Sequence, residues 1–368
     1  MFKSYLNFFF LTKKIFSKPK EKKILIFDSD DSEIISRYFK KDEVETLHIR
    51  MAYKSRQNLN LYVLLKTFLG FKFSMKSYYE EYIEFVNPKI IITLSDNWPI
   101  IYDLKKNRDK TKKIVIQRAF RTCLPTDMLS NLKYLKQNKT KFNCDYLLMF
   151  NEEIGKIYNS FVDAKVIPIG SFRSNSISKN PKLKRKKIDI LFISTFRPYL
   201  KVKNEDLIFF KNLKRYCIKK GIKIHVLGST NTDLEKRFFK NTFKESMQLF
   251  LSKTENRSTY KIVDLAKIIL SIDSTLGYEA AARGKNVGFF CIRSKKFPLS
   301  TFKFGWPVKK NSKGNFWTDK NSYSEISRII NFYKNKNANK VMQKKIKDVI
   351  SFDQNNKSFK SLIKNLKI

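Results

Sequence analysis

The chain has 368 residues, a formal net charge of +43 at pH 7, and 42% hydrophobic residues. Its length predicts about two domains. An apolar content that includes 33 Phe excludes a chain that is disordered overall. The positive charge comes mostly from Lys dispersed along the chain, without the basic stripe, interleaved aromatics or module of a nucleic-acid-binding protein. We therefore expect no nucleic-acid partner and a charged surface that favours anionic partners.

The four Cys form no CxxC pair, and only two His could join them as ligands, so we expect no structural zinc site. Unpaired Cys are typical of a reducing, cytoplasmic compartment. No apolar run reaches the roughly 20 residues that span a bilayer. Residues 1–22 form a basic amphipathic segment without the cleavage site of a signal peptide. This segment could pack on the fold, fray, or hold the protein peripherally on the inner face of the inner membrane.

The expected elements of the N-terminal half alternate between strands and helices. Apolar runs predict strands at residues 23–27, 44–49, 89–94, 112–117 and 144–150, and helical spacing predicts helices at residues 34–39, 59–71 and 75–87. Pro88 ends the last of these helices. This order favours a parallel sheet that is covered on both faces.

The pattern restarts after residues 174–187, a polar, basic, Pro-containing stretch that we interpret as a linker. Strands are expected at residues 188–194, 223–228, 267–273 and 286–292, and helices at residues 205–220, 259–266, 324–333 and 341–352. Gly221 closes the first of these helices. We therefore predict an α/β fold with two Rossmann-like domains, at residues 23–173 and 188–335, followed by C-terminal helices at residues 336–368.

Polar residues follow several predicted strands, at the edge where open parallel sheets bind ligands. After the strand that ends near Asp273, Ser274 and Thr275 can cap a helix and leave its first N–H groups free for an anion. Gly277 would let a ligand approach the backbone, and Glu279 could accept hydrogen bonds from ribose or sugar hydroxyls. An ordinary capped helix is the alternative interpretation.

Two arginines and one lysine near the ends of predicted strands could neutralise a phosphate, although a surface salt bridge is an equally good interpretation of each. They are Arg173, Arg197 and Lys285. Ser194 and Thr195 could bind phosphate or cap a turn. The rings of residues 306, 316 and 317 could stack on a base or sugar, but anchoring of a hydrophobic loop is favoured.

The segment DSTLGYEAAARGKNVGFF, residues 273–290, resembles the donor-binding segment of GT-B glycosyltransferases of bacterial surface-carbohydrate biosynthesis. This class includes capsule and lipopolysaccharide sugar transferases and the 3-deoxy-octulosonic acid transferases, which carry Ser/Thr–x–Gly–x–Glu–Ala at this place. Further similar segments follow in order between residues 23 and 317: ILIFDSDDSE, IITLSDNW, IVIQRAFR, IGSFRSN, ILFISTFRP and FKFGWPVKKNSKGNFW. One segment departs from the family, because Gln117 to Arg121 reads QRAFR instead of Gln-Asn-Gly-Arg, which puts roles for these two residues in doubt.

The resemblance implies two domains that face each other across a cleft, with an acceptor held by the first and a nucleotide-sugar by the second. It implies transfer of a sugar to a glycan or lipid-linked acceptor of a capsule, O-antigen or lipopolysaccharide. The nucleotide-sugar is a co-substrate, and no cofactor or metal is expected, since helix dipoles and cationic side chains can neutralise the departing phosphate. The candidate donor-binding residues are Ser194, Thr195, Arg197, Ser274, Thr275, Gly277, Glu279, Arg173 and Lys285. The candidate bases for the acceptor hydroxyl are Asp28, Asp30 and Asp96, with the first two favoured.

A second interpretation starts from the same first strand. The stretch KILIFDSDDS also resembles the first motif of haloacid-dehalogenase-like phosphatases, with Asp28 as nucleophile, Asp30 as acid and Mg²⁺ bound. That chemistry needs a later acidic pair after a strand to hold the metal, and the stretch around Asp273 offers one Asp. It would also leave the second α/β domain unexplained, so we keep it as the weaker alternative.

Overall fold

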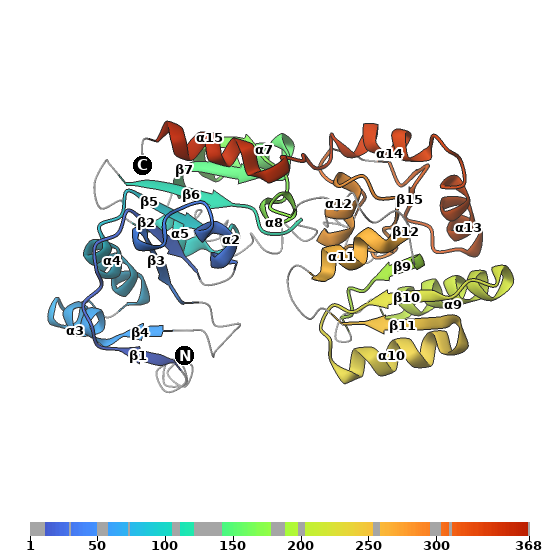
Figure 1. The fold of residues 1–368 in the computed structure, drawn as a ribbon, viewed down its shortest axis with the longest axis horizontal. Coiled ribbons are helices and arrows are strands. Elements are labelled where there is room, and N and C mark those ends of the chain that lie inside the picture. The colour runs from blue at the N-terminus through green and yellow to red at the C-terminus, as the bar shows by residue number, and fades with distance from the viewer. Residues whose placement is uncertain are drawn as a thin grey trace. The chain divides into compact units, whose positions relative to one another are not determined.

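The structure is a computed structural model, and it describes residues 12–28, 31–49, 58–72, 74–104, 111–120, 142–177, 188–197, 203–252, 258–294, 303–308 and 311–366, with the side chains of residues 203 and 258 outside this set. The chain divides into two compact α/β units (Figure 1). The N-terminal unit comprises residues 1–118, 129–176 and 356–368, and the C-terminal unit comprises residues 119–128 and 177–355. The predicted α/β class with two Rossmann-like domains is confirmed.

The N-terminal unit is built on a six-stranded sheet, in the order β3-β2-β5-β6-β7-β8, among the residues that the structure describes. All neighbouring strands in it are parallel. Its strands are β2 (Ile24–Phe27), β3 (Val44–Leu47), β5 (Ile90–Thr93), β6 (Lys112–Ile116), β7 (Phe142–Met149) and β8 (Val162–Pro168). Strands β2 and β5 are buried along their whole length, because helices cover both faces.

The helices of this unit follow the strands in Rossmann fashion. They are α2 (Ser32–Ser36), α4 (Met75–Val86), α5 (Pro99–Asp103), α7 (Glu152–Asn159), α8 (Phe172–Asn175) and α15 (Lys357–Asn365). A small parallel sheet, β1 (Lys13–Ile15) with β4 (Asn58–Asn60), and helix α3 (Leu61–Leu69) lie next to α4 in the same unit. The sequence predicted helix throughout residues 59–71, whereas the first residues of this stretch pair with β1.

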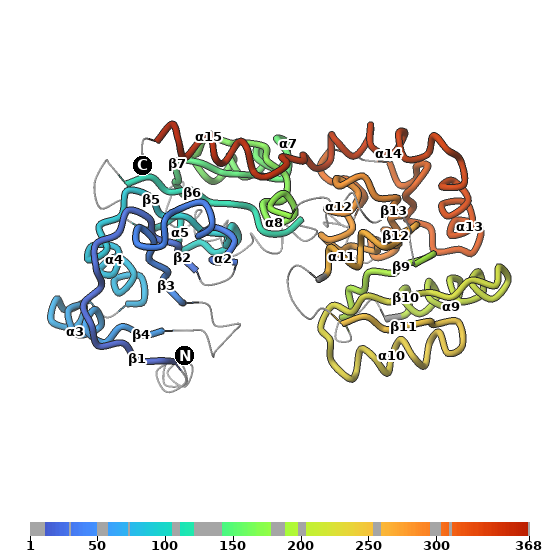
Figure 2. The backbone as a smooth tube through the Cα atoms, viewed as in Figure 1, coloured from blue at the N-terminus to red at the C-terminus, as the bar shows by residue number. Residues whose placement is uncertain are grey.

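The last helix, α15, returns to the N-terminal unit after the chain has completed the C-terminal one (Figure 2). Phe359 and Leu362 of α15 join a core that contains Ile34 and Ile35 of α2. Asn356, which precedes α15, donates hydrogen bonds to the Tyr38 hydroxyl at 2.8 Å and to the Phe172 carbonyl at 2.9 Å. The predicted domain at residues 23–173 therefore has an additional helix from the other end of the chain.

The C-terminal unit is built on a sheet in the order β11-β10-β9-β12-β13-β15-β14. Its strands are β9 (Ile188–Ile193), β10 (Ile224–Leu227), β11 (Met247–Leu251), β12 (Ala266–Ser271), β13 (Val287–Phe290), β14 (Lys313–Gly314) and β15 (Trp317–Thr318). Only the pair β14 and β15 is antiparallel among the described strands of this sheet. Its helices are α9 (Lys203–Lys220), α10 (Asp233–Phe243), α11 (Ser258–Leu265), α12 (Thr275–Ala282), α13 (Tyr323–Phe332) and α14 (Ala338–Ile346).

Two sequence expectations change in the structure, and the favoured interpretation of two aromatic rings agrees with it. Ser174 and Asn175 are buried within α8, so the first two residues of the predicted linker belong to the N-terminal unit. The rings of Phe316 and Trp317 are buried, and Trp317 stacks on Phe304 with centroids 4.6 Å apart. They form a hydrophobic anchor, as the favoured interpretation had it. The predicted C-terminal helices separate, since α14 belongs to one unit and α15 to the other.

Candidate functional site

The C-terminal sheet reverses its winding direction between β9 and β12. From β9 the chain proceeds to β10 and β11 on one side, and then crosses to β12 and β13 on the other. Ile193 pairs with Ser271 at the carboxyl ends of these two strands, so the residues after them begin side by side. Ligands of open α/β sheets bind at such a reversal point. Ser194 and Thr195 follow β9 there, and Asp273, Ser274 and Thr275 follow β12.

A buried arginine that the sequence analysis missed ties these segments together. The Arg293 side chain, three residues after β13, is 1% exposed. It donates to the Asp206 carboxylate at 3.0 and 2.5 Å, to Asp273 at 2.9 Å, and to the hydroxyl and carbonyl oxygens of Thr195, both at 3.2 Å. Burial by itself would lower the pKa of Arg293, but the two carboxylates have the larger effect and raise the pKa above its ordinary value. The guanidinium therefore stays charged. The network holds the loops after β9 and β12 in place.

One oxygen of the buried Asp273 carboxylate has no partner within the part of the chain that the structure describes. Its Oδ2 accepts from Arg293 and lies 3.8 Å from a guanidinium nitrogen of Arg197. Its Oδ1 is buried and has no hydrogen-bond partner among the described residues. Burying such an oxygen without a donor is costly, so a ligand hydroxyl or N–H is a natural partner. Arg197 is about one-third exposed and can also reach a ligand.

The start of α12 has the features of an anion site. Ser274 is its N-cap, but its side chain makes no capping hydrogen bond. The N–H of Gly277 donates to the Ser274 carbonyl at 3.0 Å, whereas the N–H groups of Thr275 and Leu276 have no partner among the described residues. The Thr275 hydroxyl accepts from the N–H of Phe120 at 3.0 Å. The N–H groups of Thr275 and Leu276, together with the Ser274 hydroxyl, are suited to bind a phosphate at the start of this helix.

Phe120 covers part of this helix start from within the same unit. Its ring stacks on Tyr278 with centroids 4.0 Å apart and planes 5° apart. The altered stretch after Gln117 therefore has a structural role. Gln117 itself is buried, and its side-chain oxygen accepts from the Phe150 N–H at 2.8 Å. Arg121 lies outside the described residues.

Gly277 is required by the packing of α12 against β12. A Cβ atom at this position would lie 2.5 Å from Ser271 Oγ, 2.7 Å from Ser271 Cβ and 3.4 Å from the Phe289 ring. Real Cβ atoms essentially never approach other atoms this closely, so the glycine lets α12 lie against β12. Packing is thus a reason for Gly277 that the sequence analysis did not anticipate, and its role in ligand approach stays a prediction.

Two further candidates lie away from the start of α12. Glu279 is 5% exposed and accepts from the Tyr260 hydroxyl at 2.8 Å, so it is engaged inside the unit. Lys285 follows the other end of α12 and precedes β13. Its ammonium group lies 3.0 Å from the Asp264 carboxylate. A helix of this length separates its two ends by about 12 Å, so Lys285 does not join the site at the carboxyl ends of the strands, contrary to expectation.

Ser194 is held by a second missed residue, Glu235. The Ser194 hydroxyl donates to Glu235 at 2.5 Å, and the N–H groups of residues 229, 230 and 231 donate to the same carboxylate at 2.8–2.9 Å. Burial raises the pKa of Glu235, but these hydrogen bonds outweigh it and lower the pKa below its ordinary value. Thr232 accepts from the Glu235 N–H as N-cap of α10. The spacing of Thr232 and Glu235 is that of a capping box, a signal present in the sequence.

The N-terminal sheet reverses its winding between β2 and β5, and candidate acids follow both strands. Asp28 is 1% exposed, has a φ of 126°, and accepts from the Ser95 hydroxyl. Asp96 is fully buried. Its carboxylate accepts from the Tyr158 hydroxyl at 2.6 Å and from the Arg118 N–H at 3.1 Å. Asp30 lies outside the described residues.

Arg173 lies in the N-terminal unit, beside these candidate acids. It pairs with Asp31, and the guanidinium of Arg118 lies 3.6 Å from the same carboxylate. Asp31 is buried, whereas the side chains of Arg173 and Arg118 are 28% and 24% exposed. Arg173 therefore lies with the acids of the N-terminal unit, and its role in donor binding stays a prediction.

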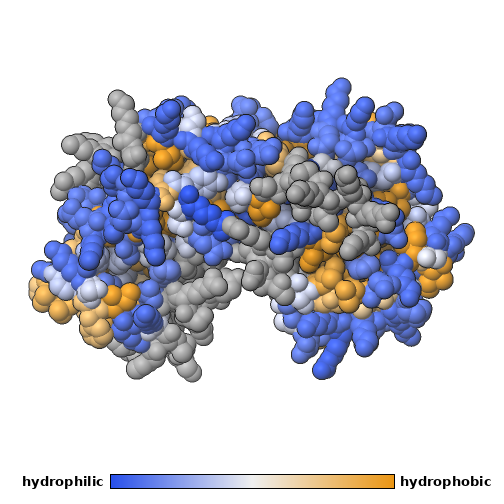
Figure 3. Space-filling view, in the orientation of Figure 1, coloured by the Kyte–Doolittle hydropathy of each residue, from blue (hydrophilic) through white to orange (hydrophobic). Residues whose placement is uncertain are grey.

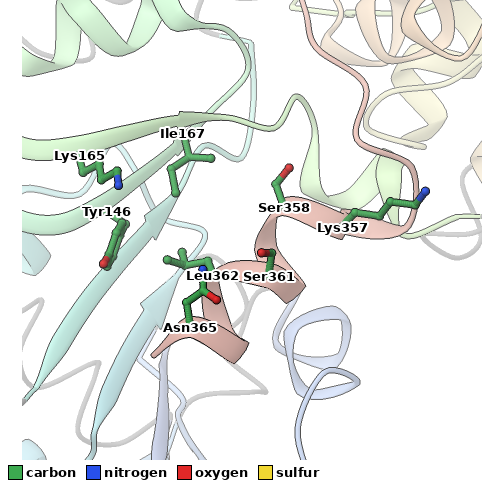
Figure 4. Close-up of a pocket in the computed structure, with 8 residues that line it drawn as sticks. All are labelled: Tyr146, Lys165, Ile167, Lys357, Ser358, Ser361, Leu362 and Asn365. Atoms are coloured by element: carbon green, nitrogen blue, oxygen red, sulfur yellow. The ribbon is translucent and has the colours of Figure 1, made fainter. Parts of the chain in front are cut away.

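A pocket of about 640 Å³ lies elsewhere in the N-terminal unit (Figure 4). Tyr146 and Lys165 line it from the middle of β7 and β8, and Ser358 and Ser361 line it from α15. It lies beside the covering helix and not at the carboxyl ends of the strands, so we do not regard it as the functional site. Among the described residues, no group of three His, Cys, Asp or Glu is placed to hold a metal ion, and no helix has the length and apolar character to cross a membrane.

The chain resembles several solved structures at low sequence identity. The wall teichoic acid polymerase TagF matches with a TM-score of 0.55 and 10% identity, over 95% of this chain and 90% of TagF. Staphylococcus aureus MnaA with UDP matches with a TM-score of 0.56 and 12% identity, over 94% of this chain and 96% of MnaA. The pneumococcal O-GlcNAc transferase GtfA, with UDP and GlcNAc, matches with a TM-score of 0.50 and 11% identity, over 79% of this chain and 60% of GtfA. These likenesses show the fold, which is of the GT-B type.

No curated protein sequence matches the chain. A family model described as "putative O-antigen biosynthesis protein" matches residues 114–367, which is well over half of the chain and includes the whole C-terminal site. The protein therefore belongs to this O-antigen biosynthesis protein family.

Proposed function

We propose that this protein is a glycosyltransferase that moves a sugar from a nucleotide-sugar to a glycan or lipid-linked acceptor during O-antigen or related surface polysaccharide synthesis. The family and the fold both support it. The structures of GtfA and MnaA, two proteins of the same fold, contain UDP. Capsule and lipopolysaccharide are the related products that the same chemistry would serve.

The observation that carries the proposal is the arrangement at the reversal point of the C-terminal sheet. Two N–H groups and the Ser274 hydroxyl at the start of α12 are available for a diphosphate. Arg197 supplies a cation that reaches outward. The Oδ1 atom of Asp273, which has no partner among the described residues, accepts a hydrogen bond from a hydroxyl of the ribose or of the sugar. Such an arrangement stabilises the charge that develops on the departing phosphate, and we propose that no cofactor or metal is required.

The N-terminal site supplies the base for the acceptor hydroxyl in this proposal. Asp28 is favoured over Asp96, because both carboxylate oxygens of Asp96 already accept hydrogen bonds from other elements. Ser95 orients Asp28 by donating to it. Arg118 and Arg173, partly exposed next to the buried Asp31, give this site a cationic rim. No specific observation favours the phosphatase alternative, which uses only the first unit.

We also propose a cytoplasmic location with peripheral contact to the inner membrane. The net charge of +43 attracts the anionic lipids of that leaflet, where a lipid-linked acceptor would lie.

The donor site is tested by thermal unfolding of the purified chain with CMP-, UDP-, GDP- and dTDP-sugars. A ligand at 100 times its Kd stabilises the folded protein by about 2.7 kcal/mol, so one nucleotide class should raise the Tm clearly. Arg197→Ala should weaken that donor about tenfold or more, because it removes a charge-assisted hydrogen bond.

The matched control is Arg237→Ala, which removes an exposed arginine of α10 in the same unit and should leave affinity unchanged. If none of the four nucleotide classes raises the Tm, while Mg²⁺ with a phosphate mimic does, the transferase proposal fails in favour of the phosphatase. Equal affinity in the Arg197 and Arg237 variants would remove Arg197 from the site.

A further inference from the structure

Helix α3 exposes three large apolar side chains. Its fully buried positions are Val63 and Thr67, and the Thr67 hydroxyl is satisfied by the Val63 carbonyl at 2.8 Å. Leu65, Phe68 and Leu69 are 58%, 46% and 65% exposed. Their i, i+3, i+4 spacing places them on one face, opposite the buried pair. A surface helix in water shows the reverse arrangement, so this face is suited to an apolar environment.

The apolar face continues beyond the helix. Phe71 is 86% exposed just after the end of α3, and Phe16 is 75% exposed directly after β1, against which α3 packs. We call Phe16, Leu65, Phe68, Leu69 and Phe71 the α3 patch. Figure 3 shows apolar residues gathered on the surface over α3. The other large apolar residues with strongly exposed side chains, among those described, belong to the C-terminal unit: Ile208, Ile218, Leu234, Leu249 and Val341.

The chain around the α3 patch is basic. Residues 12–20 and 58–72 contain no Asp or Glu. They contribute five exposed lysines: Lys13, Lys18, Lys20, Lys66 and Lys72. Among the described acids, Glu21 follows the first of these stretches and α4 carries three glutamates, of which Glu80 lies 4.0 Å from Lys76. Glu45 lines a pocket together with Ile15 and Asn58. Large apolar side chains surrounded by lysines are the composition of a surface that lies in a membrane interface.

We propose that the α3 patch docks this protein on an anionic lipid bilayer. The apolar side chains would enter the boundary between head groups and acyl chains by about 5–10 Å. The lysines around them would pair with anionic head groups. A second copy of the chain fits less well, because a symmetric contact through this patch would bring the same lysines together. The inference rests on the proposed membrane location and does not depend on the transfer reaction.

The test is co-sedimentation of the full chain with phosphatidylcholine vesicles that contain or lack phosphatidylglycerol. The wild type should bind the anionic vesicles and lose most of its binding at high salt, since the lysine contribution is screened. The double variant Phe68→Ser/Leu69→Ser should reduce binding about tenfold or more. It should keep most of the wild-type stability and the donor affinity, because these side chains are 46% and 65% exposed and belong to neither candidate site.

The matched control is Leu234→Ser/Leu249→Ser, which removes two leucines of similar exposure (60% and 51%) from the C-terminal unit and should bind vesicles like the wild type. Equal vesicle binding by the Phe68/Leu69 variant and the wild type would overturn the proposal. So would a shift of that variant from dimer to monomer on gel filtration, which would assign the patch to a second copy. A third variant, Phe8→Ser/Phe9→Ser/Phe10→Ser, changes the N-terminal segment in the full chain. If this variant loses vesicle binding and the Phe68/Leu69 variant does not, the docking belongs to the N-terminal segment. Loss of vesicle binding with intact sugar transfer separates this inference from the proposed function.

Discussion

Asp28 and Asp96 follow neighbouring parallel strands, β2 and β5, but their carboxylates have different surroundings. Asp96 holds three parts of the unit together, since it accepts from Tyr158 of α7 and from the backbone that follows β6, and its carbonyl accepts from the Tyr102 hydroxyl at 2.6 Å. Asp28 accepts from the adjacent Ser95 and has a backbone φ in the left-handed region, which is uncommon outside functional sites. We therefore propose structural support as the role of Asp96 and base chemistry as the role of Asp28.

This assignment predicts opposite phenotypes for two isosteric substitutions. Asp28→Asn should lower kcat for sugar transfer by about 10²–10⁴-fold and leave donor affinity intact, because an amide cannot accept the proton. Asp96→Asn should chiefly lower the free energy of unfolding, by about 1–3 kcal/mol, because an amide has one acceptor oxygen for two buried donors. Urea denaturation and steady-state kinetics measure the two quantities.

Asp163→Asn is the control for both, since Asp163 is an exposed carboxylate of β8 in the same unit. Full activity in the Asp28 variant would exclude Asp28 as the base. A large kinetic loss in the Asp96 variant, with wild-type stability, would exchange the two roles.

The residues that the sequence analysis missed are those whose partners are distant in the sequence. Arg293 follows a predicted strand, as Arg197 does, but only the fold shows that it is buried with Asp206 and Asp273. Arg173 could be recognised as a cation near a strand end, yet its partner Asp31 identifies the unit to which it belongs. Patterns in the sequence therefore locate the edge of the sheet, whereas pairing at that edge depends on tertiary contacts.

At the scale of elements, α12 and β12 form the closest contact in the C-terminal site. Gly277 in the first turn of α12 faces Ser271 at the end of β12. Gly277→Ala should lower the free energy of unfolding by about 1–3 kcal/mol, because the new methyl group overlaps Ser271 Oγ and Cβ in a packed core. Urea denaturation of the variant measures this loss.

The double variant Gly277→Ala/Ser271→Gly provides the control, because it removes the two atoms that the methyl group would meet. It should recover most of the stability beyond the sum of the single changes. A Gly277→Ala variant that is as stable as the wild type, yet fails to bind the nucleotide-sugar, would instead restore the interpretation that the glycine is needed for ligand approach.

Most central strands could be predicted because their signal is local. The apolar runs at residues 89–94 and 188–194 appear as β5 and β9, since strands buried on both faces are continuously apolar. The sequence analysis did not predict β8 and β11. Strand β8 mixes buried and exposed positions, and β11 has no buried position at the edge of its sheet. Helix α15 was not predicted as a helix separate from α14. Its amphipathic pattern shows that one face is buried, but it does not show which unit buries that face. Edge position and long-range docking have no local signal.

At the scale of the molecule, the order of the chain does not match the order of its units. The N-terminal unit takes its last helix from the opposite end of the sequence. Phe359 of α15 is fully buried there, with ring centroids 5.2 Å from Tyr38 and 5.0 Å from Phe172. The stability of the N-terminal sheet should therefore depend on residues that follow the whole C-terminal unit in the chain.

This organisation predicts a unit-specific effect of Phe359→Ala. Loss of a buried ring costs about 3–5 kcal/mol, and hydrogen exchange should report it as faster exchange in β2 and β5, with β9 and β12 unchanged. The matched control is Phe243→Ala, which removes a fully buried ring that contacts Phe210 and Phe239 in the C-terminal unit and should give the reverse pattern. Equal acceleration in both sheets by either variant would mean that the units unfold together, and that α15 stabilises the whole chain instead of the unit into which it packs.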